Sequence, residues 1–169
     1  SHMPNFSLGG DSFFDYSTMI TIGDVPTRIM PGGDLNAKYL RFLKKIADLC
    51  HDCIDVYGER IPMIFRPFHE DNGDWFWWSE KYLSDKDFIE LFRYTVDYLR
   101  NDCGIRNLLF SYSPNGKIES IEEYMNRYPG DDYVDNFEKE EEINLANLLQ
   151  EMKDTDAELG KVQGEFVGL

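Results

Sequence analysis

Two long stretches of the chain carry apolar residues at every third or fourth position, the spacing typical of amphipathic helices. The first stretch runs from 36 to 57, and Gly58 is its predicted end. The second begins at Ser84, where Asp87 three residues later resembles a capping box, and it continues to 99. The pattern therefore predicts two helices that each present one apolar face to a core.

Short apolar runs predict buried strands at 61–68 and 107–112, and a third short strand is a candidate at 133–135. The remaining expected elements are a turn at 113–116, a short helix at 120–127, a long helix at 138–159 and a candidate strand at 161–163. Helices that alternate with strands at this spacing indicate βα units and a parallel sheet. In such α/β folds, functional groups gather at the carboxyl ends of the strands.

The composition is that of one globular domain, and we expect residues 1–169 to form a single domain. Of the 169 residues, 42% are apolar and 29% are charged, which is enough apolar material for one sizeable core. The formal net charge of −15 opposes binding to nucleic acid and to anionic membranes. The apolar runs fall short of the roughly 18 residues that a membrane span needs. No signal peptide is recognised.

The cysteine residues give no pattern for a metal site or a disulfide scaffold. Cys50, His51 and Cys53 lie close together, but no second pair follows that would complete a zinc site. Cys103 leaves an odd number of thiols, which argues against a disulfide scaffold. We therefore expect the cysteines to be small buried residues and the protein to use neither a metal nor another cofactor.

The most informative segment, 65–78, follows the first predicted strand and reads Phe-Arg-Pro-Phe-His-Glu-Asp-Asn-Gly-Asp-Trp-Phe-Trp-Trp. Loops are usually polar because water must satisfy their backbone groups, so four consecutive aromatic residues call for another explanation. Large rings beside an ionisable carboxyl are typical of a site that stacks sugar rings and holds an acid with a perturbed pKa. The segment thus predicts a carbohydrate site at the carboxyl end of a strand.

Glu70 is the candidate acid of this site. A glycosidase needs one carboxylic acid that stays protonated near neutral pH, and burial against indole rings raises the pKa of a carboxyl group. A structural glutamate would instead face water or pair with Arg66. His69 fits either a hydrogen bond to a sugar hydroxyl or a satisfied position in the core. One of the three nearby tryptophans is expected to be a core residue.

These residues together resemble the signature of glycoside hydrolase family 26: Phe65 to Glu70, Asn72-Gly73 and Trp75 to Trp78. Further segments in the family's order and approximate spacing are His2-Met3-Pro4-Asn5, Gly9-Gly10-Asp11-Ser12-Phe13, Met30-Pro31-Gly32-Gly33, Ile46-Ala47-Asp48 and Tyr128-Pro129-Gly130-Asp131-Asp132-Tyr133-Val134-Asp135. The resemblance covers about residues 2–135. It implies a (β/α)8 barrel of the TIM type and a retaining endo-β-1,4-mannanase whose partner is β-mannan or a related polysaccharide.

Carried over residue by residue, the resemblance makes Glu70 the acid/base and His69 the histidine beside it. Trp75 then corresponds to an aromatic residue that lines a sugar subsite. His2 resembles a substrate-binding histidine of an earlier strand, although Ser1-His2-Met3 also reads as a cloning scar. The resemblance thus predicts one acid surrounded by three substrate-binding side chains.

The chain departs from the family in its length and in its second carboxylate. A complete (β/α)8 barrel takes about 250 residues. The 169 residues therefore predict an incomplete or truncated barrel, in which 136–169 match the family poorly. Phe137 stands where the family has a tyrosine that touches the nucleophile, and with Trp78 it completes the predicted substrate-binding set. Glu165 is the candidate nucleophile by its order alone, and a retaining mechanism requires its carboxyl to lie about 5–5.5 Å from that of Glu70.

Three explanations of these departures stay open. They are a longer parent chain of which stretches are missing, a genuine fragment or abbreviated relative, and a non-catalytic homologue that binds glycans. Because family 26 includes enzymes for β-1,3-xylan and mixed-linkage β-glucan, these polymers are alternative substrates. A polymeric substrate implies an extracellular, periplasmic or surface-anchored protein, and we expect it to be a monomer.

Overall fold

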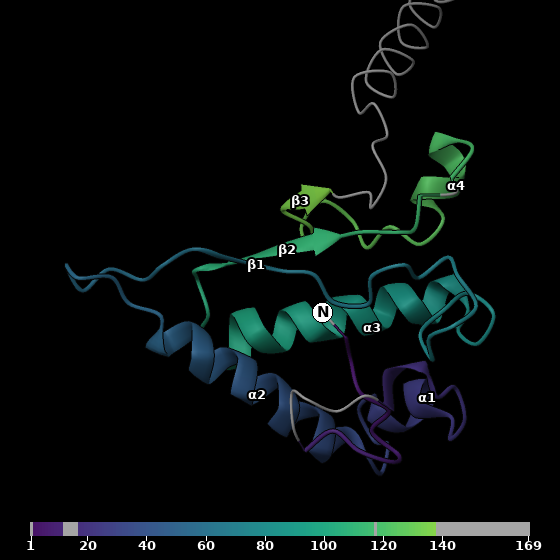
Figure 1. The fold of residues 1–169 in the computed structure, drawn as a ribbon, viewed down its shortest axis with the longest axis horizontal. Coiled ribbons are helices and arrows are strands. Elements are labelled where there is room, and N and C mark those ends of the chain that lie inside the picture. The colour runs from purple at the N-terminus through teal and green to yellow at the C-terminus, as the bar shows by residue number, and fades with distance from the viewer. Residues whose placement is uncertain (1, 12–16, 117, 138–169) are drawn as a thin grey trace, which may run out of the picture.

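The computed structural model describes residues 2–11, 17–116 and 118–137. Within these ranges the elements follow one another as η1 (Ser17–Met19), α1 (Val25–Ile29), α2 (Asn36–Asp52), β1 (Met63–Phe65), α3 (Asp85–Asp97), η2 (Tyr98–Asp102), β2 (Leu108–Tyr112), α4 (Ile121–Met125) and β3 (Asn136–Phe137). Figure 1 shows α2 and α3 on one side of a small sheet, with α4 beyond the end of the strands. This order is the alternation of helices and strands that the sequence predicts.

The strands form a parallel sheet in the order β1-β2-β3, which confirms the predicted sheet type. Phe65 of β1 lies opposite Phe110 of β2, and Ile64 lies opposite Leu109. Because successive side chains of a strand point to opposite faces, the first pair lies on one face of the sheet and the second pair on the other. Phe65 and Phe110 are buried against the helices, whereas Ile64 is 56% exposed and Leu109 is 44% exposed.

The core lies between the sheet and helices α2 and α3. Tyr39 of α2 and Thr95 of α3 are both fully buried, and their hydroxyl groups share a hydrogen bond of 2.6 Å. Phe68, just after β1, packs edge-on against Trp77 and Phe88. The largest fully buried side chains come from the helices, the sheet, the N-terminal segment and the aromatic loop: Trp77, Trp78, Tyr39, Phe6, Phe68, Phe88, Phe92, Phe110, Met3, Ile29, Leu43 and Leu91. Much of the aromatic loop therefore belongs to the core.

The first long helix is shorter than the sequence predicts. The prediction of a helix over 36–57 is wrong after 52, because the chain turns there. The Asp55 carboxylate accepts two main-chain N–H groups of this turn, at 2.9 Å each, and Gly58 takes a φ of 88°. An antiparallel bridge between Ile54 and Arg60 closes the turn. Gly58 thus supplies the positive φ of a turn, a conformation that glycine adopts without steric cost.

The strands also differ from their predicted bounds. The predicted strand 61–68 is regular only over 63–65, and Phe68 leaves it with a φ of 51°. The third strand lies at 136–137 rather than at 133–135. Just before it, the main-chain N–H of Asp135 donates to the Phe110 carbonyl, and the Asp135 carboxylate accepts the Phe110 N–H. Helices η1 and α1 were not predicted, and the predicted helix 138–159 and strand 161–163 lie outside the described residues.

The three cysteines are free thiols. Cys50 is buried, as predicted, whereas Cys53 and Cys103 are partly exposed. Across the described ranges, no group of three or more His, Cys, Asp or Glu side chains is placed to hold a metal ion. None of the helices in this part of the chain is both long enough and apolar enough to cross a membrane.

The predicted start of α3 is confirmed, because the Ser84 side chain accepts the main-chain N–H of Asp87 at 3.2 Å. Ser84→Ala removes this acceptor and leaves one N–H of the first turn without its partner. The free energy of unfolding is expected to fall by about 1 kcal/mol, measured by urea denaturation. Ser84→Asn keeps an acceptor oxygen and serves as the control. Equal stability of the two variants would contradict the capping role.

Candidate active site

Glu70 lies in the loop that follows β1, in a conformation unusual for its residue type. Its φ is 52°, in the left-handed region, and Phe68 two residues earlier has a φ of 51°. Each such residue costs on the order of 1–3 kcal/mol and persists when the surrounding structure holds it in place. The main-chain N–H of Glu70 donates to the Ser113 carbonyl at 2.8 Å, which joins the loop after β1 to the loop after β2. The main-chain hydrogen bond to Ser113 therefore fixes Glu70 at the carboxyl end of the sheet.

Trp75 contacts Glu70 directly. The indole N–H donates to Oε2 of Glu70 at 2.8 Å. The loop folds back between them, because the main-chain N–H of Gly73 donates to the Glu70 carbonyl at 3.2 Å. A Cβ added at Gly73 would lie 2.6 Å from two carbon atoms of the indole ring, so only glycine leaves room for the ring there. The hydrogen bond from Trp75 thus fixes the orientation of the half-buried Glu70 carboxyl, and the indole ring itself packs closely over Gly73.

His69 lies beside Glu70 and is only 5% exposed. The ring of His2 meets it edge-on, with 4.9 Å between the ring centroids and 73° between the ring planes. Phe76 lies against both imidazoles, at 5.8 Å from His2 and 5.1 Å from His69. The structure therefore brings four predicted site residues, His2, His69, Glu70 and Trp75, to the same end of the sheet.

The other two tryptophans of the loop are core residues. Trp77 is 1% exposed and its indole N–H donates to the Pro4 carbonyl at 3.1 Å. Trp78 is fully buried, stacks on Phe76 at 4.4 Å and donates to the His69 carbonyl at 2.9 Å. The predicted sugar contact of Trp78 does not fit this burial, because no surface of its ring is open to a ligand. Trp78 instead supports the backbone that carries His69.

A hollow of about 670 Å³ lies beside the loop, and the partly exposed Trp75 side chain forms part of its lining. Its lining combines one indole with amide and charged side chains: Asn72, Gly73, Asp74, Trp75, Glu80, Lys81, Asp85 and Asn115. Asn72 and Asn115 tie the two loops together, since the Asn72 side chain accepts the Asn115 N–H at 2.7 Å and donates to the Asn115 carbonyl at 3.3 Å. An aromatic face surrounded by a few hydrogen-bonding groups is the usual lining of a carbohydrate site.

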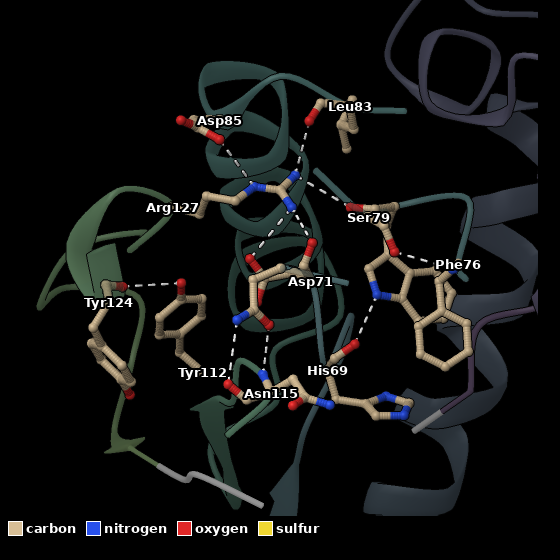
Figure 2. Close-up of polar contacts among 12 residues, drawn as sticks. His69, Asp71, Phe76, Ser79, Leu83, Asp85, Tyr112, Asn115, Tyr124 and Arg127 are labelled. Carbon is tan, nitrogen blue, oxygen red and sulfur yellow. Dashed lines mark hydrogen bonds and ion pairs between the residues drawn. The ribbon is translucent and has the colours of Figure 1, made fainter. Parts of the chain in front are cut away.

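The pair of Asp71 and Arg127 is a functional candidate that the sequence did not reveal. Both side chains are almost fully buried, and their closest charged atoms lie 3.4 Å apart. Burial raises the pKa of the Asp71 carboxyl to about 7, although the Arg127 charge opposes this shift. Burial likewise lowers the pKa of Arg127, and the charges of Asp71 and Asp85 oppose that change. Figure 2 shows the guanidinium at the centre of a group of contacts between these residues and the aromatic loop.

Of the remaining residues named from the sequence, Arg66 lies at the site, whereas the side chains of Phe137 and Glu165 are not described. The Arg66 guanidinium donates to the Ser113 hydroxyl at 3.1 Å, so it too connects the loops after β1 and β2. Phe137 lies in β3, and the structure does not describe its side chain. Glu165 lies outside the described residues. The described part of the site thus contains the predicted acid and its aromatic partner.

The profile of glycosyl hydrolase family 26 matches residues 3–151 of the chain. A parallel sheet with a carboxyl held at the strand ends is compatible with a glycoside hydrolase, and the family match covers most of the chain: the chain belongs to glycosyl hydrolase family 26. The sequence is 41% identical over 112 residues to a mannan endo-1,4-beta-mannosidase of Bifidobacterium adolescentis. That alignment covers 66% of this chain and 11% of the relative.

Solved structures show the same relationship. The catalytic domain of the Bacillus sp. JAMB-750 GH26 endo-beta-1,4-mannanase is similar with a TM-score of 0.75 and 41% identity, over 82% of this chain and 34% of that one. An endo-beta-1,4-mannanase of Cellulomonas fimi is similar with a TM-score of 0.76 and 37% identity, over 83% of this chain and 30% of that one. The chain therefore spans about a tenth to a third of the length of these relatives.

The raised pKa of Asp71 makes the stability of the fold pH-dependent. The folded chain keeps this proton up to about pH 7, whereas the unfolded chain releases it near the ordinary pKa of 3.8. The folded state thus binds more protons between these values, so the Asp71 contribution to the free energy of unfolding falls as pH rises, by at most about 1.4 kcal/mol per pH unit.

Asp71→Asn has no proton to lose, so it is expected to gain stability relative to the wild type as pH rises from about 5 to about 8. Urea denaturation of both proteins at the two pH values measures this difference. Asp74→Asn, which changes an exposed carboxylate of the same loop, is the control. A difference between Asp71→Asn and the wild type that stays constant with pH would contradict the raised pKa.

Proposed function

We propose that this chain provides the acid/base part of a retaining glycoside hydrolase that cleaves β-1,4-mannan internally. The observation that carries the proposal is the hydrogen bond from the Trp75 indole to the Glu70 carboxyl, within the loop that the family shares. A carboxyl held in one direction beside an aromatic face is suited to donate a proton to a bound sugar. The relatives named as mannan endo-1,4-beta-mannosidases support mannan as the substrate.

The proposed mechanism is a double displacement. Glu70 protonates the glycosidic oxygen while a second glutamate attacks the anomeric carbon, and the leaving group departs with the proton. Glu70, now ionised, then removes a proton from water, and the resulting hydroxide releases the sugar from the second glutamate. We propose Glu165 for the nucleophile because of its order along the chain.

The substrate is proposed to lie across Trp75. Its ring has an open side toward the hollow, and a flat indole suits the apolar face of a pyranose. His69 and His2 both contact the ring of Phe76, and we propose that their imidazole groups bind sugar hydroxyls. Phe137 is proposed to contact the sugar near the nucleophile, and Trp78 acts through the backbone of His69.

The proposed architecture is an incomplete (β/α)8 barrel in which residues 1–169 form one domain. The exposure of Ile64 and Leu109 supports this, because the inward faces of barrel strands carry apolar side chains that pack against the other strands. We further propose a monomer that acts outside the cell, in the periplasm or on the cell surface, because a polysaccharide cannot enter the cell. No cofactor takes part in the proposed reaction.

Glycan binding without turnover and hydrolysis of a different polysaccharide are the two alternative functions, and each has a specific observation in its favour. The chain spans a third or less of its catalytic relatives, which favours a glycan-binding protein without turnover as the second candidate. An indole face recognises a pyranose ring but not the orientation of its 2-hydroxyl, so β-1,3-xylan and mixed-linkage β-glucan are further candidate substrates. A panel of these polymers distinguishes the substrates by the products released.

Glu70→Gln keeps the shape of the side chain but cannot transfer a proton. The rate of mannan hydrolysis, measured as reducing sugar released, is expected to fall by roughly 10²- to 10⁴-fold. Retardation of the variant by galactomannan in affinity electrophoresis is expected to stay close to that of the wild type. Glu90→Gln, which changes an exposed glutamate of α3 outside the hollow, is the control.

Hydrolysis by Glu70→Gln within a few-fold of the wild type would contradict the acid/base role. If the wild type is retarded in the gel but releases no sugar, the glycan-binding candidate is correct instead.

Trp75→Phe keeps an aromatic ring but removes the N–H that holds Glu70. A correctly placed general acid contributes roughly 10²- to 10⁴-fold to the rate, and part of this is lost when the direction of its carboxyl is no longer fixed. We therefore expect kcat on mannan to fall by roughly 10- to 100-fold, with a smaller change in KM. Steady-state kinetics measure both values, and Tyr82→Phe provides a control for an aromatic change near the loop. An unchanged kcat would contradict the orienting role of the indole.

A further inference from the structure

We propose that Arg127 is a positioning residue that closes the segment 71–83, so that the Trp75 indole meets the Glu70 carboxyl. Arg127 follows α4 and lies far along the chain from this segment. A catalytic effect of Arg127 rests on the proposed function of Glu70. The arrangement of the loop that Arg127 holds can be tested without that function.

The guanidinium of Arg127 contacts both ends of the segment. It donates to the main-chain carbonyl of Asp71 at 2.5 Å, immediately after Glu70, and to those of Trp78 and Leu83 at 3.2 and 3.1 Å. Trp75 lies between these points. One planar cation therefore holds the two halves of the loop that must approach each other for the indole to reach the carboxyl (Figure 2).

The surroundings keep this cation in place. The Arg127 side chain is 3% exposed, and its guanidinium lies over the ring of Phe88 at 4.1 Å. The carboxylates of Asp71 and Asp85 each lie 3.4 Å from one of its nitrogen atoms. A buried cation is costly unless its charge is compensated; Asp85 provides compensation, and Asp71 adds to it once its carboxyl ionises above about pH 7. The ion pairs thus keep Arg127 inside, and its donors hold the loop.

The segment 71–83 needs such support because the backbone that leads into it is strained. Phe68 and Glu70 both have a positive φ, which persists only where neighbouring contacts hold the chain. A lysine at 127 would supply one ammonium group in place of the planar fork that reaches carbonyl groups in several directions. Arg127→Lys is therefore expected to keep the charge but to release part of the loop.

The three tryptophans give a direct measurement of this effect, because each indole N–H has a different acceptor. Trp75 donates to Glu70, Trp77 to Pro4 and Trp78 to His69. In a ¹⁵N-labelled chain, each indole N–H gives one NMR signal and has its own rate of exchange with solvent. The experiment compares the wild type with Arg127→Met, Arg127→Lys and the control Arg93→Lys, since Arg93 donates to the Pro129 carbonyl outside the segment.

In Arg127→Met the Trp75 indole signal is expected to move and its exchange to accelerate at least tenfold, with the Trp77 signal unchanged. Arg127→Lys is expected to give an intermediate effect, and Arg93→Lys none. Loss of all three signals together in both Arg127 variants would show that Arg127 acts on the whole fold, which overturns the proposal. Unchanged Trp75 exchange in both variants would overturn it as well.

Aryl β-mannosides with different leaving groups add a functional readout. A misplaced acid slows the substrates whose leaving group needs a proton, but not an activated one such as dinitrophenol. Arg127→Lys is expected to reduce kcat for the poor leaving group at least tenfold more than for the activated one. Equal losses for both would contradict the positioning role. A wild type that cleaves neither substrate counts against the proposed function alone, and the indole measurement still decides the role of Arg127.

Discussion

The hydrogen bond from the Trp75 indole to the Glu70 carboxyl is the interaction on which the rest of the site depends. It joins two residues of one loop, and it can form only because the chain between them reverses within a few positions. That reversal requires a glycine beneath the ring and a positive φ at the acid itself. A positive φ is unfavourable for a glutamate in an isolated peptide, so the surrounding fold must maintain this reversal of the chain.

The fold maintains this loop conformation through contacts from three distant parts of the chain. The loop after β2 accepts the Glu70 N–H through the Ser113 carbonyl. The N-terminal segment receives the Trp77 indole N–H at the Pro4 carbonyl and thereby anchors the far end of the aromatic run. Arg127 joins Asp71 to Leu83 from the region after α4. The acid is thus held by the backbone and by buried side chains, whereas the exposed part of Trp75 stays available for a ligand.

Sequence reasoning succeeded where the necessary information is local. The periodicity of 84–99 and the Ser84 cap predicted α3, and the strand expected before the segment 65–78 is confirmed by β1, whereas the carbohydrate site in that segment stays a prediction. It failed where a turn competed with a regular element, as at 53–60, because an aspartate that caps a turn and a helical residue look alike in a periodic pattern.

The burial of each tryptophan and the pairing of Asp71 with Arg127 depend on contacts between distant parts of the chain, which the sequence does not show. The tryptophans are alike in type and adjacent in sequence, yet Trp75 is partly open while Trp78 is fully enclosed. Nothing in the residues themselves distinguishes them, because their burial depends on packing against Phe76 and the N-terminal segment. The partner of Asp71 lies 56 positions away, and no spacing rule connects two residues at that distance.

The contact between Gly73 and the indole has an evolutionary consequence. Even the smallest side chain at position 73 would bring a carbon atom 2.6 Å from the ring, so a substitution there would push the indole away from its present position beside Glu70. Neighbouring positions such as Asp74 and Lys81 are exposed and carry no such limit. If Glu70 is the proposed proton donor, changes in substrate preference are therefore expected to accumulate on the rim of the hollow, where they leave Glu70 and Trp75 in place.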